Sequence, residues 1–331
     1  MVESQKTLVA TREEVQALMK SNFKQSNPVL AFYSSHLDRI ITDEDLMVIP
    51  IFDRQFHRAH AVFETVAIIN NRLILLDEHL ARMESGCKLV HIDLPMPLAA
   101  IREKVIDLAA FCLSFYKLEN KNFSMRFWLS SGGEAFGIFP PGNSRFYAIA
   151  LQFDRPSNAI LYKDYTIENV DPKLGVLAVA KTTNYVVNTI VAIESKKKGG
   201  FIGIMTTKEG IILEGSIMNV GFIWKNGDFV TPCFERVLKG TTLAKSMNYM
   251  EQELVPKGIV KNVVQKDFTA KDVHENAVEM MFFGGNMVLP GGSLNDVEIS
   301  KEIGPITKIL QENVILKMAW STGVPVPMDR Y

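Results

Sequence analysis

The sequence predicts an α+β fold built from two domains. The 331 residues exceed the ~150 that one core usually holds, strand-like hairpins alternate with helical stretches, and a short polar segment interrupts the chain near its middle. We therefore expect a first domain at residues 1–153, a linker at 154–158 and a second domain at 159–331.

The first domain is expected to begin with a helix that is followed by strands. Thr11 and Glu14 form the pattern of a capping box, which predicts a helix that ends near Ser21. Residues 30–43 and 46–56 then alternate apolar and polar side chains, as strands with one buried face do.

A hairpin and two helices come next. Residues 61–69 and 72–76 have strand patterns, and Asn70-Asn71 between them is typical of a tight turn. Asp77 is the expected N-cap of one helix, and a second helix covers residues 97–116. The last two strands are expected at residues 124–131 and 145–153, and a Gly/Pro-rich loop at 132–143 lies between them.

The second domain is expected to start with an apolar strand at residues 176–180 and a helix at 184–198. Two hairpins follow, with turns at 208–210 and at Asn226-Gly227, and the second pair is typical of a type I′ turn. The later elements are a helix at 242–255, a strand at 278–286 and a helix from Pro305 onward.

Charge and composition argue against several classes of protein. The 36 Lys and Arg residues against 37 Asp and Glu give a net charge of −1, which does not favour a nucleic-acid partner. No apolar run approaches the ~18 residues of a membrane span. Cys87, Cys112 and Cys233 lack the spacing of a metal site, so we expect free thiols and a reducing compartment. The N-terminal stretch does not resemble a targeting signal, and we therefore expect a cytoplasmic protein.

Lys181 is the first candidate for chemistry. It ends the apolar run VLAVA, where a charged amine is costly, and this favours the neutral amine that forms a Schiff base. The alternative is an ordinary strand-end lysine whose ammonium group reaches water.

Glu214 and two glycine-containing turns are further candidates. Glu214 ends a strand rich in Ile and Leu, where a buried carboxylate needs a partner such as a protonated pyridine nitrogen, whereas a solvated acid needs none. Gly240-Thr241-Thr242 offers amides and hydroxyls at a helix start, which suits an anion or serves as a plain N-cap. Arg82 could clamp the same anion or lie on the surface, and Gly284-Gly285 offers further amides or only a turn.

These residues belong to blocks with a wider similarity. In order and spacing, the blocks resemble those of the class IV aminotransferases, which are pyridoxal 5′-phosphate (PLP) enzymes of fold type IV. They read HRAHAVFETVAIINNRLILLDEHLARM, KTTNYVVNTIVAIESKKKGG, LEGSIMNVGFI, VLKGTT and IGPITK. The similarity covers roughly residues 29–315 and is nearest to plant-type D-amino-acid transaminases, through LAFYSSHLDRIITD, MVIP, RFWLSSG and VEMMFFGG. It implies a small N-terminal α/β domain and a larger C-terminal domain with a β-barrel-like sheet flanked by helices.

The resemblance implies roles for individual residues. Lys181 would hold PLP covalently and move the proton at the substrate Cα, and Glu214 would pair with the pyridine nitrogen. Tyr185 and Asn219 would line the cofactor. The residues that would hold the phosphate are Arg82, Gly240, Thr241, Thr242, Gly284 and Gly285. Those on the substrate side would be Phe63, Glu64 and Arg126, with Arg58 as the alternative partner of the substrate carboxylate.

The chain also departs from the bacterial D-amino-acid transaminases that it resembles. Phe63 stands where those enzymes have a tyrosine, and the loop GGEAFGIF lacks their Arg-x-His pair, so their carboxylate-binding group is absent. Gly284 replaces a hydroxyl residue of the family at the second phosphate turn. We expect Arg126 to bind the substrate carboxylate instead, and the alternative is a structural salt bridge within the first domain.

The expected activity is ping-pong transamination between an amino acid, preferably a D-amino acid, and a 2-oxo acid, carried out by a homodimer. Aminodeoxychorismate lyase and branched-chain L-amino-acid transaminase are the enzymatic alternatives, because the same machinery serves these reactions. A remote alternative is a catalytically silent protein with the same fold. The presence of Lys181, Glu214 and the Gly-Thr-Thr turn together argues against that alternative.

Overall fold

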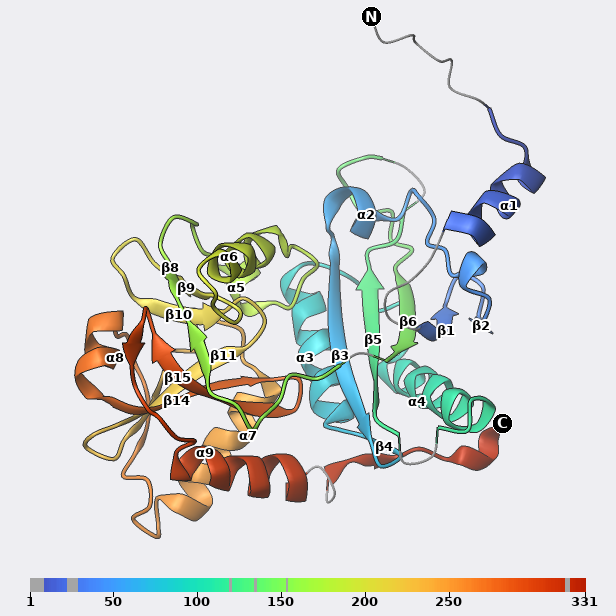
Figure 1. The fold of residues 1–331 in the computed structure, drawn as a ribbon. Helices are drawn as coiled ribbons and strands as arrows, with labels where there is room; N and C mark the ends of the chain where they lie inside the picture. The colour runs from blue at the N-terminus through green and yellow to red at the C-terminus, as the bar shows by residue number, and fades with distance from the viewer. Residues whose placement is uncertain (1–8, 23–28, 119–120, 134–135, 153, 319–321) are drawn as a thin grey trace, which may run out of the picture.

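Residues 9–22, 29–118, 121–133, 136–152, 154–318 and 322–331 are described by a computed structural model of the chain. Figure 1 shows two bodies of mixed helices and strands, the first around a sheet at the right and the second around further sheets at the left. This arrangement confirms the α+β class predicted from the sequence.

The first sheet has seven antiparallel strands in the order β17-β4-β3-β5-β6-β1-β2. Asn70 and Asn71 connect two of these strands with φ angles of 51° and 59°, which both asparagines tolerate and which a tight hairpin turn requires. The strands are β1 (Val29–Ser34), β2 (Arg39–Ile41), β3 (Ala61–Ile69), β4 (Arg72–Leu73), β5 (Phe123–Ser130), β6 (Arg145–Leu151) and β17 (Val324–Pro325).

Two helices, α3 (Leu76–Leu89) and α4 (Leu98–Phe115), cover one face of the first sheet, and the first core lies between the helices and the strands. On β3, Val62 and Val66 point into this core. Because side chains of a strand alternate between its faces, Phe63 points to the opposite face. One strand therefore contributes both to the core and to the surface that faces the second body.

The second body contains a larger and a smaller sheet. The larger sheet runs in the order β13-β12-β11-β14-β15-β16, with β7 paired to β15, and the smaller has the order β10-β9-β8. Apolar clusters around Phe222, Phe283 and Met205 fill the space between these sheets and their helices. The strands are β7 (Tyr162–Asp164), β8 (Thr166–Ile167), β9 (Ile204–Thr206), β10 (Ile212–Gly215), β11 (Asn219–Trp224), β12 (Phe229–Thr231), β13 (Val263–Gln265), β14 (Ala277–Gly284), β15 (Met287–Leu294) and β16 (Val297–Glu298).

The remaining helices include the predicted N-terminal one. Its capping box is confirmed, because the Thr11 hydroxyl accepts from the Glu14 N–H at 3.2 Å while the Glu14 carboxylate accepts from the Thr11 N–H at 2.7 Å. The α-helices other than α3 and α4 are α1 (Arg12–Asn22), α2 (Arg54–Arg58), α5 (Val176–Val179), α6 (Val186–Lys197), α7 (Thr241–Tyr249), α8 (Ala270–Asn276) and α9 (Pro305–Leu310). Turns of 3₁₀-helix lie at Glu44–Leu46 and Met328–Arg330, and π-helical turns extend α7 and α9 at Met250–Leu254 and Gln311–Met318.

The predicted strand at residues 176–180 is wrong. Its first four residues form α5, which begins directly after Gly175. Val176 and Leu177 are 41% and 37% exposed, so the run is not buried as the predicted strand would be. A short apolar run has no periodicity that separates a helix from a buried strand, and the surrounding chain decides.

Two further predictions in the first domain differ from the structure. Residues 46–56 are not a strand, since they begin in a 3₁₀ turn and end in α2. Helix α3 begins after Leu75, which has a φ of 55°, so Asp77 is not the N-cap. Asp77 lies in the first turn instead, where an acidic side chain complements the positive end of the helix dipole.

The predicted type I′ turn at Asn226-Gly227 is also wrong. Of these two residues only Gly227 has a positive φ. The Gly227 N–H donates to the Trp224 carbonyl at 2.8 Å, and the Trp224 N–H donates to the Asp228 carbonyl at 2.9 Å. This is a three-residue connection, a type I turn followed by a left-handed glycine, and it serves the same hairpin.

The chain returns to the first sheet at its C-terminal end. β17 pairs with β4, Val326 packs in the first core, and Arg330 forms ion pairs with Asp107 and Glu103 of α4. Figure 1 shows the red C-terminal end of the chain beside α4. The predicted domain ranges stay a prediction, and these contacts associate residues 324–331 with the first body. None of the helices in the described ranges combines the length and the apolarity that crossing a membrane requires.

Candidate active site

The backbone at Lys181 joins the two bodies. Thr182 forms an isolated antiparallel bridge with Val62 of β3. The Phe63 N–H donates to the Lys181 carbonyl at 2.9 Å, and the Thr183 N–H donates to the Ala61 carbonyl at 3.0 Å. These bonds fix the segment after α5 against the first sheet, so the Lys181 side chain leaves the backbone at the junction.

The Lys181 amine lies between two aromatic rings. Its Nζ donates to the Tyr185 hydroxyl at 2.9 Å and lies 4.5 Å from the centroid of the Phe63 ring. The two rings meet edge to face, with centroids 5.1 Å apart. Since α6 begins directly after Tyr185, the helix sets the position of this hydroxyl. The predicted residues Lys181, Tyr185 and Phe63 are therefore in mutual contact.

Glu214, at the end of β10, is a buried carboxylate without a charged partner in contact. It is 8% exposed, and Asn219 Nδ2 donates to its Oε2 at 3.1 Å. Within the described residues no lysine or arginine lies within ion-pair distance of it. Burial raises the pKa of Glu214 to about 7, while the charges of Lys173, Lys181 and Arg82 and a hydrogen bond from the Leu238 backbone act in the opposite direction. A protonated ring nitrogen would supply the partner that this acid lacks.

The start of α7 and the turn after β14 lie side by side. Gly240 is the N-cap of α7, and a Cβ at this position would lie 1.9 Å from Asn219 Oδ1. The Asn286 N–H donates to the Thr242 hydroxyl at 3.2 Å, which joins the two turns. Gly285 has a φ of +56°, and Asn286 Nδ2 is buried without a hydrogen-bond partner in the described chain.

Arg82 reaches this region from α3 of the first body. Its Nε and Nη2 donate to the two oxygens of Glu64 at 2.7 and 2.6 Å, and its Nη1 donates to the Lys239 carbonyl, next to Gly240, at 3.2 Å. His79 Nδ1 lies 2.6 Å from the same Glu64 carboxylate. Burial opposes the ionisation of Glu64, but the charges of Arg82 and His79 and their hydrogen bonds lower its pKa to about 2.

The predicted position of Glu64 on the substrate side is therefore wrong. Its side chain is fully buried and points toward α3, on the opposite face of β3 from Phe63. Sequence reasoning missed this ion pair because it joins β3 to a helix 18 positions later in the chain. The matching signal was the pair of side chains His79 and Arg82, which can both donate hydrogen bonds and lie three residues apart on one face of that helix.

Arg126 lies on the sheet face that carries Phe63. Its guanidinium carbon is 5.5 Å from the centroid of the Phe63 ring, and its Nε donates to the Thr65 hydroxyl at 3.1 Å. Among the described residues it has no acidic partner, so the alternative of a structural salt bridge has no support. Partial desolvation lowers the pKa of Arg126, and the nearby Tyr185 acts in the opposite direction.

Arg58 is bound to backbone carbonyls at the end of α2. It donates to the carbonyls of His57 and Phe136, each at 2.9 Å. Arg54 of the same helix donates to the carbonyls of Gly137 and Ile138 at 2.6 and 2.5 Å. The two arginines thus hold the described part of the loop at 132–143, whose positions 134 and 135 lie outside the described residues.

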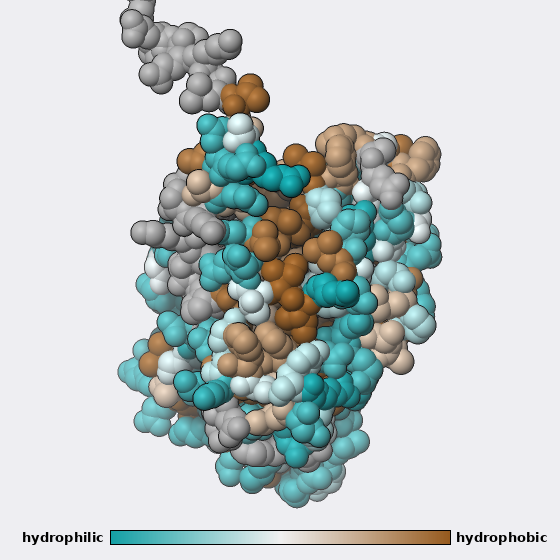
Figure 2. Space-filling model, turned by 90° about the vertical axis from the view of Figure 1, so that its right-hand side faces the viewer, coloured by the Kyte–Doolittle hydropathy of each residue, from teal (hydrophilic) through white to brown (hydrophobic). Residues whose placement is uncertain are grey.

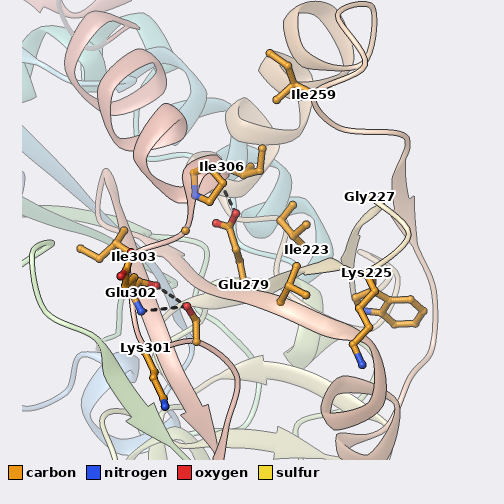
Figure 3. A pocket seen from close by; sticks show the side chains of 14 residues that line it. Ile223, Lys225, Gly227, Ile259, Glu279, Lys301, Glu302, Ile303 and Ile306 are labelled. Carbon is orange, nitrogen blue, oxygen red and sulfur yellow. Dashed lines mark hydrogen bonds between the residues drawn. The ribbon is translucent and has the colours of Figure 1, made fainter.

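A surface hollow of the second body lies apart from this junction. Figure 3 shows it; its volume is about 630 Å³, and none of the predicted cofactor or substrate residues lines it. One of its two acids, Glu279, points toward the start of α9 and accepts from the Ile306 and Thr307 N–H groups at 3.0 and 2.9 Å. This carboxylate satisfies the N–H groups at a helix end.

The residues at the junction fit PLP. An amine is available at Lys181, and amides and hydroxyls surround the start of α7. Among the described residues, the buried acid Glu214 has no cation in contact and Asn286 Nδ2 has no hydrogen-bond partner. The Lys181 amine would bind the reactive carbon of the cofactor, and Glu214 would bind its ring nitrogen. The groups at the start of α7 would bind its phosphate.

Several known proteins are similar to this chain over most of its length. The family Amino-transferase class IV matches residues 61–290. The chloroplastic D-amino-acid transaminase of Arabidopsis thaliana is 35% identical over 294 residues, which are 87% of this chain and 76% of that protein. The D-alanine aminotransferase of Bacillus licheniformis is 23% identical over 272 residues, 80% of this chain and 89% of that protein.

A solved structure shares the fold. The branched-chain aminotransferase of Thermoproteus uzoniensis, crystallised with norvaline, superimposes with a TM-score of 0.78 at 18% identity, over 91% of this chain and 100% of that one. This likeness confirms fold type IV. The chain belongs to the class IV aminotransferases and is a PLP-dependent enzyme that transfers an amino group between an amino acid and a 2-oxo acid.

Proposed function

We propose that the enzyme takes the amino group from a D-amino acid. The observation that carries the proposal is the guanidinium of Arg126, which lies beside Phe63 and has no acidic partner among the described residues. Such a cation suits the carboxylate that every amino acid and 2-oxo acid carries. We propose the D configuration because the Arabidopsis relative is a D-amino-acid transaminase.

The cofactor contacts are part of the same proposal. When bound, PLP withdraws electrons from the substrate Cα. Glu214 would hold a proton at the pyridine nitrogen, with Asn219 fixing the orientation of the carboxylate. The phosphate would bind at the start of α7 and the adjacent turn, through Gly240, Thr241, Thr242, Gly284, Gly285 and the guanidinium of Arg82.

Lys181 would carry the proton during the reaction. Its amine would remove the proton from the substrate Cα and return it on the cofactor side, as a positioned base does. The Tyr185 hydroxyl, 2.9 Å from Nζ, restricts the amine to one direction. The Phe63 ring packs 4.5 Å from the same amine. Since both half-reactions use these groups, donor and acceptor would bind in turn at one place.

Half-reactions with single donors test the proposal. Holoenzyme is mixed with D-alanine, D-aspartate, L-leucine or L-glutamate, and the change in visible absorption is followed for each donor. We expect the D-amino acids to react faster than both L-amino acids. A preference for L-leucine would contradict the proposed configuration. Release of pyruvate from aminodeoxychorismate, without transamination of any donor, would replace transamination with the lyase reaction.

We also propose a homodimer. Figure 2 shows apolar residues gathered in a band across the side of the molecule that carries α1, β1 and β2. The segment before α2 exposes several apolar side chains, namely Leu46, Val48, Ile51 and Phe52. Exposed apolar area of this kind is common where two chains meet. Sedimentation at micromolar concentration should give twice the mass of the chain, and a monomer would contradict the proposal.

The cytoplasmic location stays a proposal. It was predicted from the N-terminal sequence, and the Arabidopsis relative is a chloroplastic protein. A fluorescent fusion of the full chain would distinguish the two compartments: a diffuse cytoplasmic signal is expected, and a signal confined to an organelle would contradict the prediction.

A further inference from the structure

An arginine in the connection between the two bodies contacts the turn beside α7. Arg155 lies between β6 and β7, and its side chain is partly buried. Its Nη2 donates to the Gly285 carbonyl at 2.6 Å and to the Asn286 carbonyl at 3.1 Å. Burial lowers the pKa of Arg155, and no carboxylate of the described residues counteracts this effect. The charge of this guanidinium is therefore directed at two backbone carbonyls.

The turn after β14 consists of two consecutive residues in the left-handed region. The φ angles of Gly285 and Asn286 are 56° and 57°, as a two-residue hairpin turn requires. A Cβ at the preceding Gly284 would lie 2.9 Å from Met218 Cγ, which leaves little room for a side chain there. At Gly284 and Gly285 the turn can thus offer a ligand only backbone groups, whose direction depends on what holds the peptide units.

Thr242 holds the other side of one of these peptide units. The Asn286 N–H belongs to the same unit as the Gly285 carbonyl, and it donates to the Thr242 hydroxyl at 3.2 Å. Because the C=O and N–H of a trans peptide point in opposite directions, Arg155 and Thr242 bind this unit from opposite sides. A charged donor at the carbonyl also polarises the unit, which strengthens its N–H as a donor.

The bond from Asn286 determines where the proton of the Thr242 hydroxyl can point. The Thr242 side chain is buried, at 3% exposed. A hydroxyl has one proton and accepts through the lone pairs of its oxygen. Since the oxygen accepts from the Asn286 N–H, the proton points away from the turn. Among the described residues this hydroxyl donates to no acceptor, so the proton is available to a ligand at the start of α7.

We infer that Arg155 is a positioning residue of the phosphate site: it fixes the Gly285–Asn286 peptide, whose N–H in turn directs the Thr242 hydroxyl proton toward the phosphate. The inference rests on the proposed phosphate contacts, to which it adds a residue from the connection between the two bodies. A donor that is oriented in advance binds its ligand more tightly, because less freedom is lost on binding.

The test compares two ligands that differ only in the phosphate group. Cofactor-free protein is titrated with PLP or with pyridoxal, and the visible absorbance of the ligand bound at Lys181 gives the Kd of each. We expect Arg155→Met to raise the Kd for PLP roughly tenfold. The Kd for pyridoxal and the melting temperature should stay the same. Arg155→Lys keeps a cationic donor and should recover most of the affinity for PLP. Arg155→Ala replaces the methionine variant if that variant does not fold.

A double variant shows whether Arg155 acts through Thr242. Thr242→Val removes the hydroxyl while keeping the shape of the side chain, and it should raise the Kd for PLP. Since Arg155 acts through that hydroxyl, Arg155→Met combined with Thr242→Val should bind PLP about as weakly as Thr242→Val alone. Two losses that add in full would overturn the inference.

Arg72→Met is the matched control, since Arg72 also donates to a backbone carbonyl far along the chain, that of Gly323, at 2.9 Å. It should leave both Kd values unchanged. An equal loss of affinity for PLP and pyridoxal in Arg155→Met, or no loss for PLP, would overturn the inference.

Thr242→Val separates this failure from a failure of the proposed function. If Thr242→Val weakens the binding of PLP and leaves that of pyridoxal unchanged, the proposed phosphate site stands, and the result for Arg155→Met decides the inference alone. An unchanged Kd for PLP in Thr242→Val would remove the phosphate assignment, and the inference with it.

Discussion

The cofactor side and the substrate side of the junction differ in how their polar groups are satisfied. On the cofactor side, the chain orients its own groups while leaving Glu214 in need of a cation: Asn219 binds Glu214, and Thr242 binds the turn at Asn286. On the substrate side, Arg126 has one hydrogen bond to Thr65 and no acidic partner among the described residues. The comparison indicates that the cofactor side is organised before a ligand binds, whereas the substrate side leaves a cation for the ligand to satisfy.

The largest effect is expected at Lys181, which serves both sides. Lys181→Ala removes the group that holds the cofactor and carries the proton, so kcat should fall by ~10⁴-fold or more. The melting temperature of the cofactor-free protein should stay the same, because the backbone bonds at this residue remain. Lys257→Ala, at an exposed ion pair with Glu253, is the control and should keep full activity. Turnover above one hundredth of the wild-type rate in Lys181→Ala would contradict its role.

Glu214→Gln tests the cofactor side alone. A neutral amide cannot hold the proton at the pyridine nitrogen, and the loss of one preorganised charge costs ~2–4 kcal/mol of activation free energy, or roughly 30- to 1,000-fold in kcat. PLP should remain bound, as its visible spectrum would show. Steady-state kinetics with a near-normal kcat would mean that Glu214 is not the partner of the ring.

Glu64→Gln tests the ion pair that positions Arg82. Since the pKa of Glu64 is lowered to about 2 in the folded protein, its charge stabilises the fold above pH ~4.5, and this contribution is lost as the pH falls toward 2. At pH 7 the substitution should cost about 3 kcal/mol in the free energy of unfolding, measured with urea.

The control for this variant lies on the same helix. Glu84→Gln removes a partly exposed carboxylate paired with the exposed Lys88 at 3.3 Å, and it should change the stability by less than ~0.5 kcal/mol. An equal loss of unfolding free energy in the two variants would show that burial of the Glu64–Arg82 pair does not add to the stability of the fold. The cofactor affinity of Glu64→Gln should fall as well, because Arg82 loses the carboxylate that orients it.

Arg126→Lys is expected to have the smallest effect of these variants, and it tests the substrate side. A lysine keeps the charge but cannot form two parallel hydrogen bonds, so KM should rise about tenfold, or ~1.4 kcal/mol, for every donor. The cofactor spectrum and the melting temperature should stay the same. Arg236→Lys, at an exposed ion pair with Asp267, is the matched control. A fall in stability with KM unchanged would instead indicate a structural role for Arg126.

The sequence predicted the cofactor side more completely than the rest of the molecule. Lys181, Glu214 and the Gly-Thr-Thr turn stand in compact motifs, and the structure brings them to one junction. The apolar run before Lys181 was misassigned, because five residues carry no period that separates α5 from a strand. Glu64 was placed on the wrong side, because the face on which a strand residue lies depends on the register of β3 against its neighbours.

Arg155 was not predicted at all. Its surroundings, DRPSN, read as an ordinary polar linker. Only the path of the chain between the two bodies brings its guanidinium to the carbonyl of Gly285, 130 positions later. Long-range packing of this kind depends on both bodies together, and no local pattern in the sequence encodes it.

The most direct test of the account is to find which lysine holds the cofactor. Holoenzyme is reduced with borohydride, which fixes PLP to the amine that carries it, and the digested protein is mapped by mass spectrometry. The account predicts a single labelled peptide that contains Lys181. A label on any other lysine would contradict the central assignment.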